Sequence, residues 1–213
     1  PAIDRMIDSV REVLNLPDPI GQIENLRSMP SGIKVGQMSV PIGVIGIIYE
    51  SRPNVTIEAA SLCVKSGNTV ILRGGSEAIF SNQCLADCLS TALDQAKLPV
   101  KAVQLVETVD RAAVGSLLKL SECIDLIIPR GGKSLVARIA EEARIPVIKH
   151  LDGNCHLYLD HGVDLEVALK VAINSKTNRY GTCNTMETLL IAESLIDNLL
   201  PTIVKEMFSH GVE

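Results

Sequence analysis

The feature that most constrains the fold of this chain is a regular alternation of short apolar runs with longer amphipathic stretches. The apolar runs lie at residues 44–49, 69–72, 102–106 and 124–128. Stretches with helical spacing follow these runs at residues 55–65, 74–95 and 131–144. A further helix is predicted to begin after the capping residue Asp110. Parallel strands need long crossover connections, which are usually helices. The order therefore predicts an α/β fold with a doubly wound, mostly parallel sheet.

The segments on either side extend or interrupt this rhythm. Residues 1–15 have an apolar stripe at helical spacing and predict a helix, whereas residues 16–41 are turn-rich. The elements predicted beyond residue 145 are strands at 146–148, 155–159 and 187–191 and helices at 164–175 and 194–208. The rhythm restarts near the loop that contains Cys183, so we expect a domain boundary there, between residues 175 and 176.

The composition agrees with such a sheet and argues against several classes of function. Hydrophobic residues make up 46% of the chain, which has no Trp, two Phe and three Tyr. The core must then consist of aliphatic side chains, as in parallel strands covered by helices. A net charge of −5 argues against nucleic acid as a partner. No apolar run approaches the roughly 20 residues that span a bilayer, so we expect no membrane partner.

The chain has no sequence sign of export or of a metal centre. Its N-terminal residues are charged from Asp4 onward and lack the apolar core of a signal peptide. The six cysteines have no paired spacing of the kind that zinc sites need. We therefore expect a cytoplasmic protein with reduced cysteines and no bound metal.

Turns at the carboxyl ends of the predicted strands are candidates for a ligand site, because ligands of doubly wound sheets bind there. They are residues 49–54, 73–77 and 129–134. The last contains Gly-Lys-Ser, but Ile127 stands where a Walker loop has its first glycine, which excludes a nucleoside triphosphate loop. Two interpretations remain: an anion site at a helix N-terminus beside Arg130, or a plain turn between strand and helix.

Cys183 lies in the run NRYGTCNTMETLL, between a glycine turn and a predicted strand. A buried structural cysteine usually has apolar neighbours, whereas small polar residues flank this one. Cys183 is therefore a candidate nucleophile, and a structural thiol is the alternative. Asn54, on the first of the three turns, is a candidate amide for an oxyanion site. His150 and His156 are expected to pack or to form hydrogen bonds rather than to be bases, and their spacing indicates no metal site.

Four stretches of the sequence together resemble a known family. They are VPIGVIGIIYESRPNVTIEAASLCVKSGNTVILRGGSEA, IDLIIPRGG, LDGNCHLYLD and KTNRYGTCNTMETLL. In this order they resemble the γ-glutamyl phosphate reductases, also called glutamate-5-semialdehyde dehydrogenases, which are proline-biosynthesis enzymes of the aldehyde dehydrogenase superfamily. The resemblance runs along the whole chain and implies an aldehyde dehydrogenase-like fold. Members of that family are considerably longer, so the resemblance implies a fragment of a longer chain.

The resemblance also implies a reaction. Cys183 would displace phosphate from γ-glutamyl phosphate to form a thioester, and a hydride from NADPH would reduce that thioester to glutamate 5-semialdehyde. Asn54 would hold the oxyanion together with the backbone N–H of Cys183. Arg52 and Arg179 are expected, from position and charge alone, to bind the phosphate or carboxylate of the substrate.

The cofactor NADPH or NADP would bind to the turns after two strands. Arg73 and Glu77 would lie at the adenosine ribose, with Arg73 or Ser76 at the 2′-phosphate. The residues expected to bind the cofactor are Arg73, Gly74, Ser76, Glu77, Arg130, Gly131 and Gly132. Residues 1–175 would then be most of an NADP-binding domain, and residues 176–213 the start of a catalytic domain.

Some expectations concern residues and partners outside this core set. His150 stands where hydrolytic aldehyde dehydrogenases have a glutamate that activates water, a substitution that favours a reductase, although His150 could also be a base. A glutamate 5-kinase partner that hands over the acyl phosphate, and a homo-oligomer of the full-length protein, are expected. The alternatives are a reductase of another acyl phosphate or acyl-CoA, or a non-catalytic cofactor-binding module.

Overall fold

The computed structural model describes residues 2–149 and 153–212, and these divide into two compact units. The first unit is Pro1–Lys149 and the second is His150–Glu213. The boundary expected between residues 175 and 176 falls inside helix α6 (Leu165–Thr177), which packs within the second unit. The assignment of cofactor binding and catalysis to separate domains stays a prediction.

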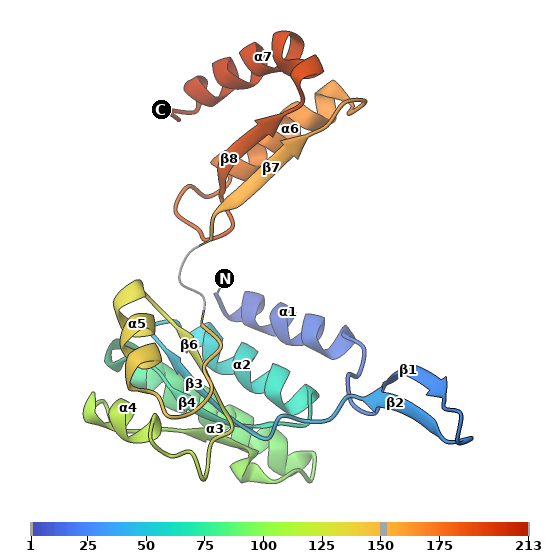
Figure 1. Cartoon of the computed structure of the whole chain (residues 1–213). Coiled ribbons are helices and arrows are strands. Elements are labelled where there is room, and N and C mark those ends of the chain that lie inside the picture. Colours follow the sequence, from blue (N-terminus) through green and yellow to red (C-terminus); the bar gives the residue numbers. More distant parts are fainter. Residues whose placement is uncertain (1, 150–152, 213) are drawn as a thin grey trace. The chain divides into compact units, whose positions relative to one another are not determined.

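A four-stranded parallel sheet forms the centre of the first unit (Figure 1). Its strands are β3 (Val44–Tyr49), β4 (Thr69–Arg73), β5 (Val103–Leu105) and β6 (Leu126–Arg130), in the order β5-β4-β3-β6. All three pairings are parallel, which confirms the predicted α/β fold with a parallel sheet. The strand expected at residues 146–148 is reduced to one bridge, between Val147 and Ile127.

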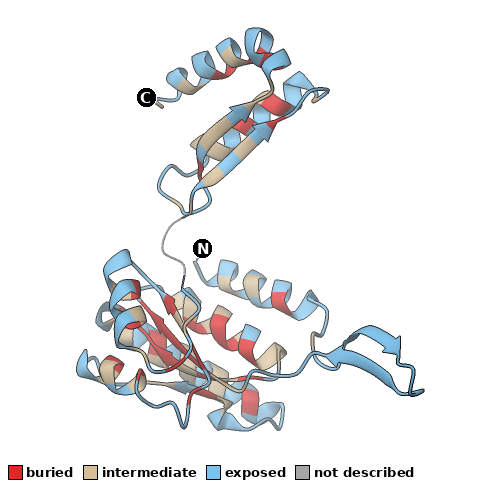
Figure 2. Cartoon of the chain, in the orientation of Figure 1, coloured by how far each residue is buried: buried red, intermediate tan, exposed pale blue. Residues whose placement is uncertain are grey.

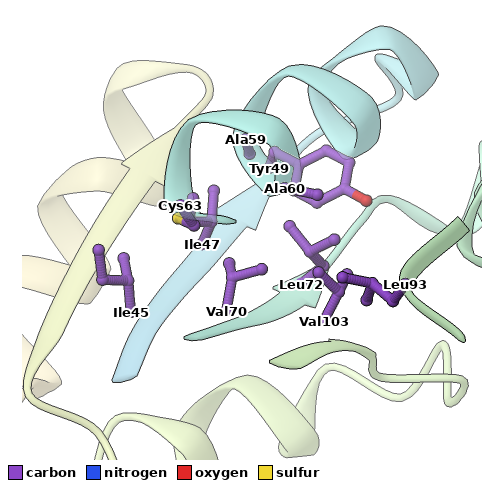
Figure 3. Packing of buried hydrophobic residues seen from close by; sticks show 10 residues of the cluster. All are labelled: Ile45, Ile47, Tyr49, Ala59, Ala60, Cys63, Val70, Leu72, Leu93 and Val103. Atoms are coloured by element: carbon purple, nitrogen blue, oxygen red, sulfur yellow. The ribbon is translucent and has the colours of Figure 1, made fainter. Parts of the chain in front are cut away.

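Helices cover both faces of this sheet, so it is doubly wound. Alternate residues of β3 point to opposite faces, with Ile47 in one apolar cluster and Ile48 in the other. The first cluster includes residues of α2 (Pro53–Lys65) and α3 (Ile79–Gln95), and Figure 3 shows its buried side chains between strands and helices. The second includes residues of α4 (Ala112–Leu117) and α5 (Lys133–Glu142). Figure 2 shows the buried residues concentrated along these strands and the helix faces that cover them.

Several helix ends have the local causes that the sequence predicts. Gly67, at φ 68°, follows the last turn of α2, and its N–H donates to Val64 O at 3.1 Å. Asp110 Oδ1 accepts from Ala112 N at 2.9 Å at the start of α4. Helix α3 begins later than expected, because the short 3₁₀ helix η1 (Ser76–Ala78) precedes it. A second 3₁₀ helix, η2 (Val100–Ala102), leads into β5.

The N-terminal segment consists of α1 (Ala2–Asn15) and an antiparallel hairpin of β1 (Ile23–Ser28) and β2 (Lys34–Met38). Helix α1 confirms the first predicted helix. The prediction of a turn-rich segment over residues 16–41 is wrong for the hairpin. All residues of both strands are exposed, as the pale blue hairpin in Figure 2 shows. The register shifts between Glu24 and Arg27, which interrupts the alternation that identifies a strand in a sequence.

The second unit is a two-stranded parallel sheet covered by two helices. Strands β7 (Cys155–Leu159) and β8 (Met186–Ile191) pair in parallel, and α6 connects them. The 3₁₀ helix η3 (Glu193–Leu195) and α7 (Ile196–Ser209) follow. Asp164 caps α6 as predicted, accepting from Val167 N at 2.9 Å. The apolar core of this unit joins Leu159 of β7 to residues of α6 and α7.

Among the residues that the structure describes, no helix is both long and apolar enough to cross a membrane.

Candidate functional site

The order of the strands creates a switch point between β3 and β6. The chain runs outward from β3 through β4 to β5 and then returns to form β6 on the other side of β3. The turns after β3 and β6 therefore diverge at the carboxyl end of the sheet, where doubly wound folds bind ligands. The three turns that the sequence singles out, at residues 49–54, 73–77 and 129–134, all lie at this end.

A cavity of about 650 Å³ opens at this end of the sheet. This is within the usual size range of sites for small molecules and cofactors. Three of the residues predicted to bind the cofactor, Arg73, Ser76 and Glu77, line it, and so does Arg52, which was predicted to bind substrate. Further residues from the turns and from α4 and α5 line the cavity: Glu50, Ser51, Gly75, Val109, Arg111, Val114, Ser134, Leu135 and Arg138.

Arg73, at the end of β4, is the most buried cation of the cavity, with 9% of its surface exposed. Its Nη1 donates to Gly74 O at 3.0 Å, and its Nη2 donates to Val109 O at 3.0 Å. Its Nε is buried and has no hydrogen-bond partner among the described residues. Burial, followed by the nearby positive charge of Arg111, lowers the pKa of the guanidinium from its usual value. The Nε of Arg73 thus has no partner in the described part of the chain, while its two terminal nitrogens hold the turn after β4 against residues 109 and 110.

Gly74 and Gly75 let this turn lie close to its neighbours. An added Cβ at Gly74 would stand 2.2 Å from Asn82 Nδ2, and one at Gly75 would stand 2.8 Å from Ser51 Oγ. Ser51 Oγ in turn donates to Glu77 Oε2 at 2.6 Å. The turns after β3 and β4 are therefore joined by a side-chain hydrogen bond on the wall of the cavity.

The N-terminus of α5 has a carboxylate against it. The backbone N–H of Gly132 donates to Glu50 Oε1 at 2.9 Å, although the two residues are 82 positions apart. An added Cβ at Gly131 would stand 2.8 Å from the same carboxylate. An anion at a helix N-terminus is favourable by about 0.3–1 kcal/mol, because free N–H groups and the helix dipole point at it. Arg130 is exposed and pairs with Tyr49 at the end of the sheet. The anion at this helix start is the chain's own Glu50 carboxylate, so a site for an external anion at this turn stays a prediction.

The cavity fits the phosphates of a dinucleotide on two structural observations. Arg73 has a buried, unpaired Nε, and the missing side chain of Gly131 leaves room for an oxygen atom, which in this structure is a carboxylate oxygen of Glu50 bonded to Gly132 N–H. Gly131 and Gly132 themselves are not among the residues that line the cavity. Both groups favour a phosphate, because charged hydrogen bonds to phosphate oxygens are strong. These residues could hold part of a nicotinamide dinucleotide.

In the second unit, Cys183 lies in the loop between α6 and β8, and it is exposed. Side-chain hydrogen bonds fix the backbone around it. Thr182 Oγ1 donates to Arg179 O at 3.2 Å, and Thr185 Oγ1 also donates to Arg179 O. Cys155 Sγ, at the start of β7, lies 3.3 Å from Cys183 O. The thiol of Cys183 therefore stands on a braced loop and is reachable from solvent.

A polar cavity of about 350 Å³ adjoins this loop. Residues on both sides of Cys183 line it, together with residues from the end of α6: Asn174, Ser175, Asn178, Arg179, Thr182, Asn184 and Thr185. Arg179, predicted to bind substrate, therefore lies on the wall of a cavity beside the predicted nucleophile. The other wall groups are amides and hydroxyls, which can hydrogen-bond to phosphate or carboxylate oxygens.

Asn54 lies in the first turn of α2 and is exposed, and its Nδ2 donates to Glu58 Oε1 at 3.2 Å. It belongs to the first unit and Cys183 to the second, so their expected partnership stays a prediction. His150 lies outside the described residues. Within the described part of the chain, no group of three or more His, Cys, Asp or Glu side chains could hold a metal ion.

Reasoning from the sequence missed Glu50, Arg111 and Arg138 as cavity residues. Glu50 belongs to a turn that the sequence singled out, and its position after a buried strand is the signal that could have identified it. Arg111, just before α4, and Arg138, on α5, reach the cavity only through the packing of these two helices. No spacing in the sequence identifies such residues.

Comparison with known proteins gives this arrangement a context. The model of the aldehyde dehydrogenase family matches residues 2–212. A crystal structure of γ-glutamyl phosphate reductase from Thermotoga maritima is 43% identical, with a TM-score of 0.87 over 99% of this chain and 51% of that one. The structure of γ-glutamyl phosphate reductase from Saccharomyces cerevisiae is 34% identical, with a TM-score of 0.61 over 98% of this chain and 51% of that one.

A more distant structure shares the fold alone. It is an acetylating aldehyde dehydrogenase from Geobacillus thermoglucosidasius, 23% identical, with a TM-score of 0.64 over 94% of this chain and 43% of that one. The chain thus spans about half the length of the solved structures that it matches. The family match covers nearly every residue, including both cavities and the loop of Cys183. The chain belongs to the aldehyde dehydrogenase family.

Proposed function

We propose that the polypeptide in which this sequence occurs is a γ-glutamyl phosphate reductase that uses NADPH to form glutamate 5-semialdehyde and phosphate in proline biosynthesis. The observation that supports this most is the 43% identity to the reductase of Thermotoga maritima over 99% of this chain. The exposed Cys183 and the phosphate-compatible cavity of the first unit agree with it.

Cys183 is the nucleophile of the proposed reaction. Its thiolate attacks the acyl carbon of γ-glutamyl phosphate, so that a C–S bond forms, the C–O bond to phosphate breaks and inorganic phosphate leaves. This divides one difficult reduction into two easier steps. The backbone N–H of Cys183 and the amide of Asn54 stabilise the oxyanion in each step. When bound, NADPH supplies the hydride that reduces the thioester.

The remaining predicted residues bind the two ligands. Arg179, on the wall of the polar cavity beside Cys183, takes a phosphate or carboxylate oxygen of the substrate, and Arg52 has the same proposed role. Arg73, Ser76 and Glu77 line the wall for the adenosine ribose and its 2′-phosphate. Since two nitrogens of Arg73 already hold backbone carbonyls, its unpaired Nε and the Ser76 hydroxyl are the groups for that phosphate.

The experiment that tests this function follows NADP⁺ reduction by the whole polypeptide in which this sequence occurs. The substrate is Δ1-pyrroline-5-carboxylate, the cyclised form of glutamate 5-semialdehyde, with and without inorganic phosphate. We expect activity that requires phosphate, because phosphate must resolve the thioester in this direction. Cys183→Ala should abolish it, whereas Cys123→Ala, which removes another exposed cysteine, should leave it unchanged.

The alternatives predict other results. Activity that does not depend on phosphate would mean that water or another acceptor resolves the thioester, and stimulation by coenzyme A instead of phosphate would indicate an acyl-CoA reductase. If the polypeptide binds the cofactor but has no activity, and Cys183→Ala leaves that binding unchanged, the result would support a non-catalytic cofactor-binding module.

A further inference from the structure

The cavity of the first unit has a carboxylate in the position that best suits a phosphate. Glu50 Oε1 accepts the N–H of Gly132 at the start of α5, at 2.9 Å. The same carboxylate is the group that an added Cβ at Gly131 would meet first, at 2.8 Å. The carboxylate of Glu50 thus occupies the Gly132 N–H and the space beside Gly131, both of which an anion bound at this helix N-terminus would need.

The rest of the cavity is rich in positive charge. Arg52, Arg73, Arg111 and Arg138 line it together with one further carboxylate, that of Glu77, and Arg138 pairs with Glu142. Arg73 has a buried Nε without a hydrogen-bond partner among the described residues. This second observation points to an anionic ligand independently of the helix N-terminus. A carboxylate among these groups has two effects on such a ligand. It competes for Gly132 N–H, and it repels a phosphate that comes close.

The backbone of Glu50 is fixed, but its side chain can move away from the N-terminus of α5. Glu50 N donates to Arg130 O at 3.2 Å and Glu50 O accepts from Arg52 N at 2.7 Å. Its side chain is exposed to solvent. Rotation about its side-chain bonds therefore frees Gly132 N–H without moving either strand, and the carboxylate then regains its water.

We propose that Glu50 is an internal substitute for a cofactor phosphate: its carboxylate caps α5 in the free protein and must leave when the pyrophosphate of NADPH binds. Glu50 would then lower the affinity for the dinucleotide and hold the turn before α5 in shape until it arrives. This inference rests on the proposed function, because it assumes a dinucleotide in this cavity.

The test is a titration of the whole polypeptide with NADPH, followed by nicotinamide fluorescence. Glu50→Gln keeps the size of the side chain and removes its charge. We expect it to bind NADPH about 2- to 10-fold more tightly than the wild type, since a competing anion at a helix N-terminus is lost. Glu141→Gln removes the same charge from the exposed C-terminal end of α5 and should leave the affinity unchanged.

A second probe separates competition for the pyrophosphate position from a general change in charge. Adenosine 2′-monophosphate has the 2′-phosphate but no pyrophosphate, so its affinity, measured by displacement of NADPH, should be equal in the wild type and Glu50→Gln. The melting temperature without ligand should fall slightly in Glu50→Gln, because a neutral amide oxygen interacts less favourably with the N-terminus of α5 than a carboxylate does.

A purely structural cap predicts the lower melting temperature together with unchanged or weaker NADPH binding, and that result overturns the inference. An equal gain in affinity for NADPH and for adenosine 2′-monophosphate overturns it as well, because the effect would then be one of net charge. If the wild type and both variants all fail to bind NADPH, the cofactor assignment of the proposed function fails, an outcome distinct from the other two.

Discussion

At the scale of single residues, the cysteines differ in burial: Cys63 is buried, Cys155 is partly buried and the other four are exposed. Cys63 of α2 is 5% exposed in the core of the first unit, and burial raises its pKa to about 11. Its pKa in an unfolded chain is near 9.0. Below pH 9 the thiol is protonated in both states, and stability is unaffected. Between pH 9 and 11 the unfolded chain loses this proton first, so the free energy of unfolding must fall as the pH rises.

We therefore expect the wild type to lose about 2–3 kcal/mol more stability than Cys63→Ala between pH 8 and pH 11, from two pKa units of linkage. Urea unfolding under reducing conditions measures this. Comparing the two proteins cancels the other groups that titrate in this range. Cys123→Ala, at an exposed cysteine, should follow the wild type at every pH. Parallel curves for the wild type and Cys63→Ala would show that the thiol of Cys63 ionises freely in the folded state.

At the scale of elements, the turn between β4 and η1 depends on a glycine for packing. Tyr49 and Asn82 are 1% and 0% exposed, and Thr56 links their side chains by hydrogen bonds of 2.8 and 3.1 Å. A Cβ at Gly74 would stand 2.2 Å from Asn82 Nδ2 and 3.0 Å from the ring of Tyr49. Gly74→Ala should therefore cost about 1–3 kcal/mol, the usual cost of overpacking a buried site.

Thermal unfolding followed by circular dichroism measures this cost. The matched control is Gly115→Ala in α4, where the added Cβ has only one neighbour, at 3.8 Å. That change should be neutral or stabilising, because Ala is the better helix former. If both variants melt together, the network of Tyr49, Thr56 and Asn82 must yield more easily than its burial suggests.

The elements also indicate what a sequence can predict. Strand β3 has the predicted bounds, because helices cover both of its faces and every residue of it is apolar or glycine. The hairpin of β1 and β2 was missed because both faces are exposed and the bulge near Asn25, at φ 54°, breaks the alternation. Capping residues such as Asp164 were predictable because their contacts are local.

In the candidate site, too, features with local causes were predictable from the sequence, and features that depend on long-range contacts were not. The turns that form the cavity were predictable, since the carboxyl ends of parallel strands meet at one edge of the sheet. The contact between Glu50 and Gly132 was not, because it depends on the pairing of β3 with β6. Arg73 was chosen for its charge, yet two of its nitrogens hold backbone carbonyls of the cavity wall, which only the packed structure reveals.

At the scale of the whole molecule, the sequence rhythm does not identify which strands belong together. It restarts near residue 176, whereas the compact units divide before β7, because β7 pairs with β8 and α6 packs with both α7 and the apolar core of that small sheet. Each unit therefore has its own core. The cavity proposed for the cofactor is lined entirely by residues of the first unit.

Because residues of the first unit line this cavity, we expect the cofactor to stabilise the first unit more than the second. A ligand at about 100 times its Kd slows exchange through unfolding of the unit that binds it by about 100-fold, or about 2.7 kcal/mol. With NADPH, amides of β3, β4 and β6 should gain this protection, measured by hydrogen exchange and mass spectrometry. Amides of β7 and β8 should gain much less protection, and adenosine, which has no phosphates, should protect neither unit. Equal protection of both units by NADPH would mean that the cofactor also contacts the second unit or that the two unfold together, whereas no protection of the first unit would contradict the cofactor site itself.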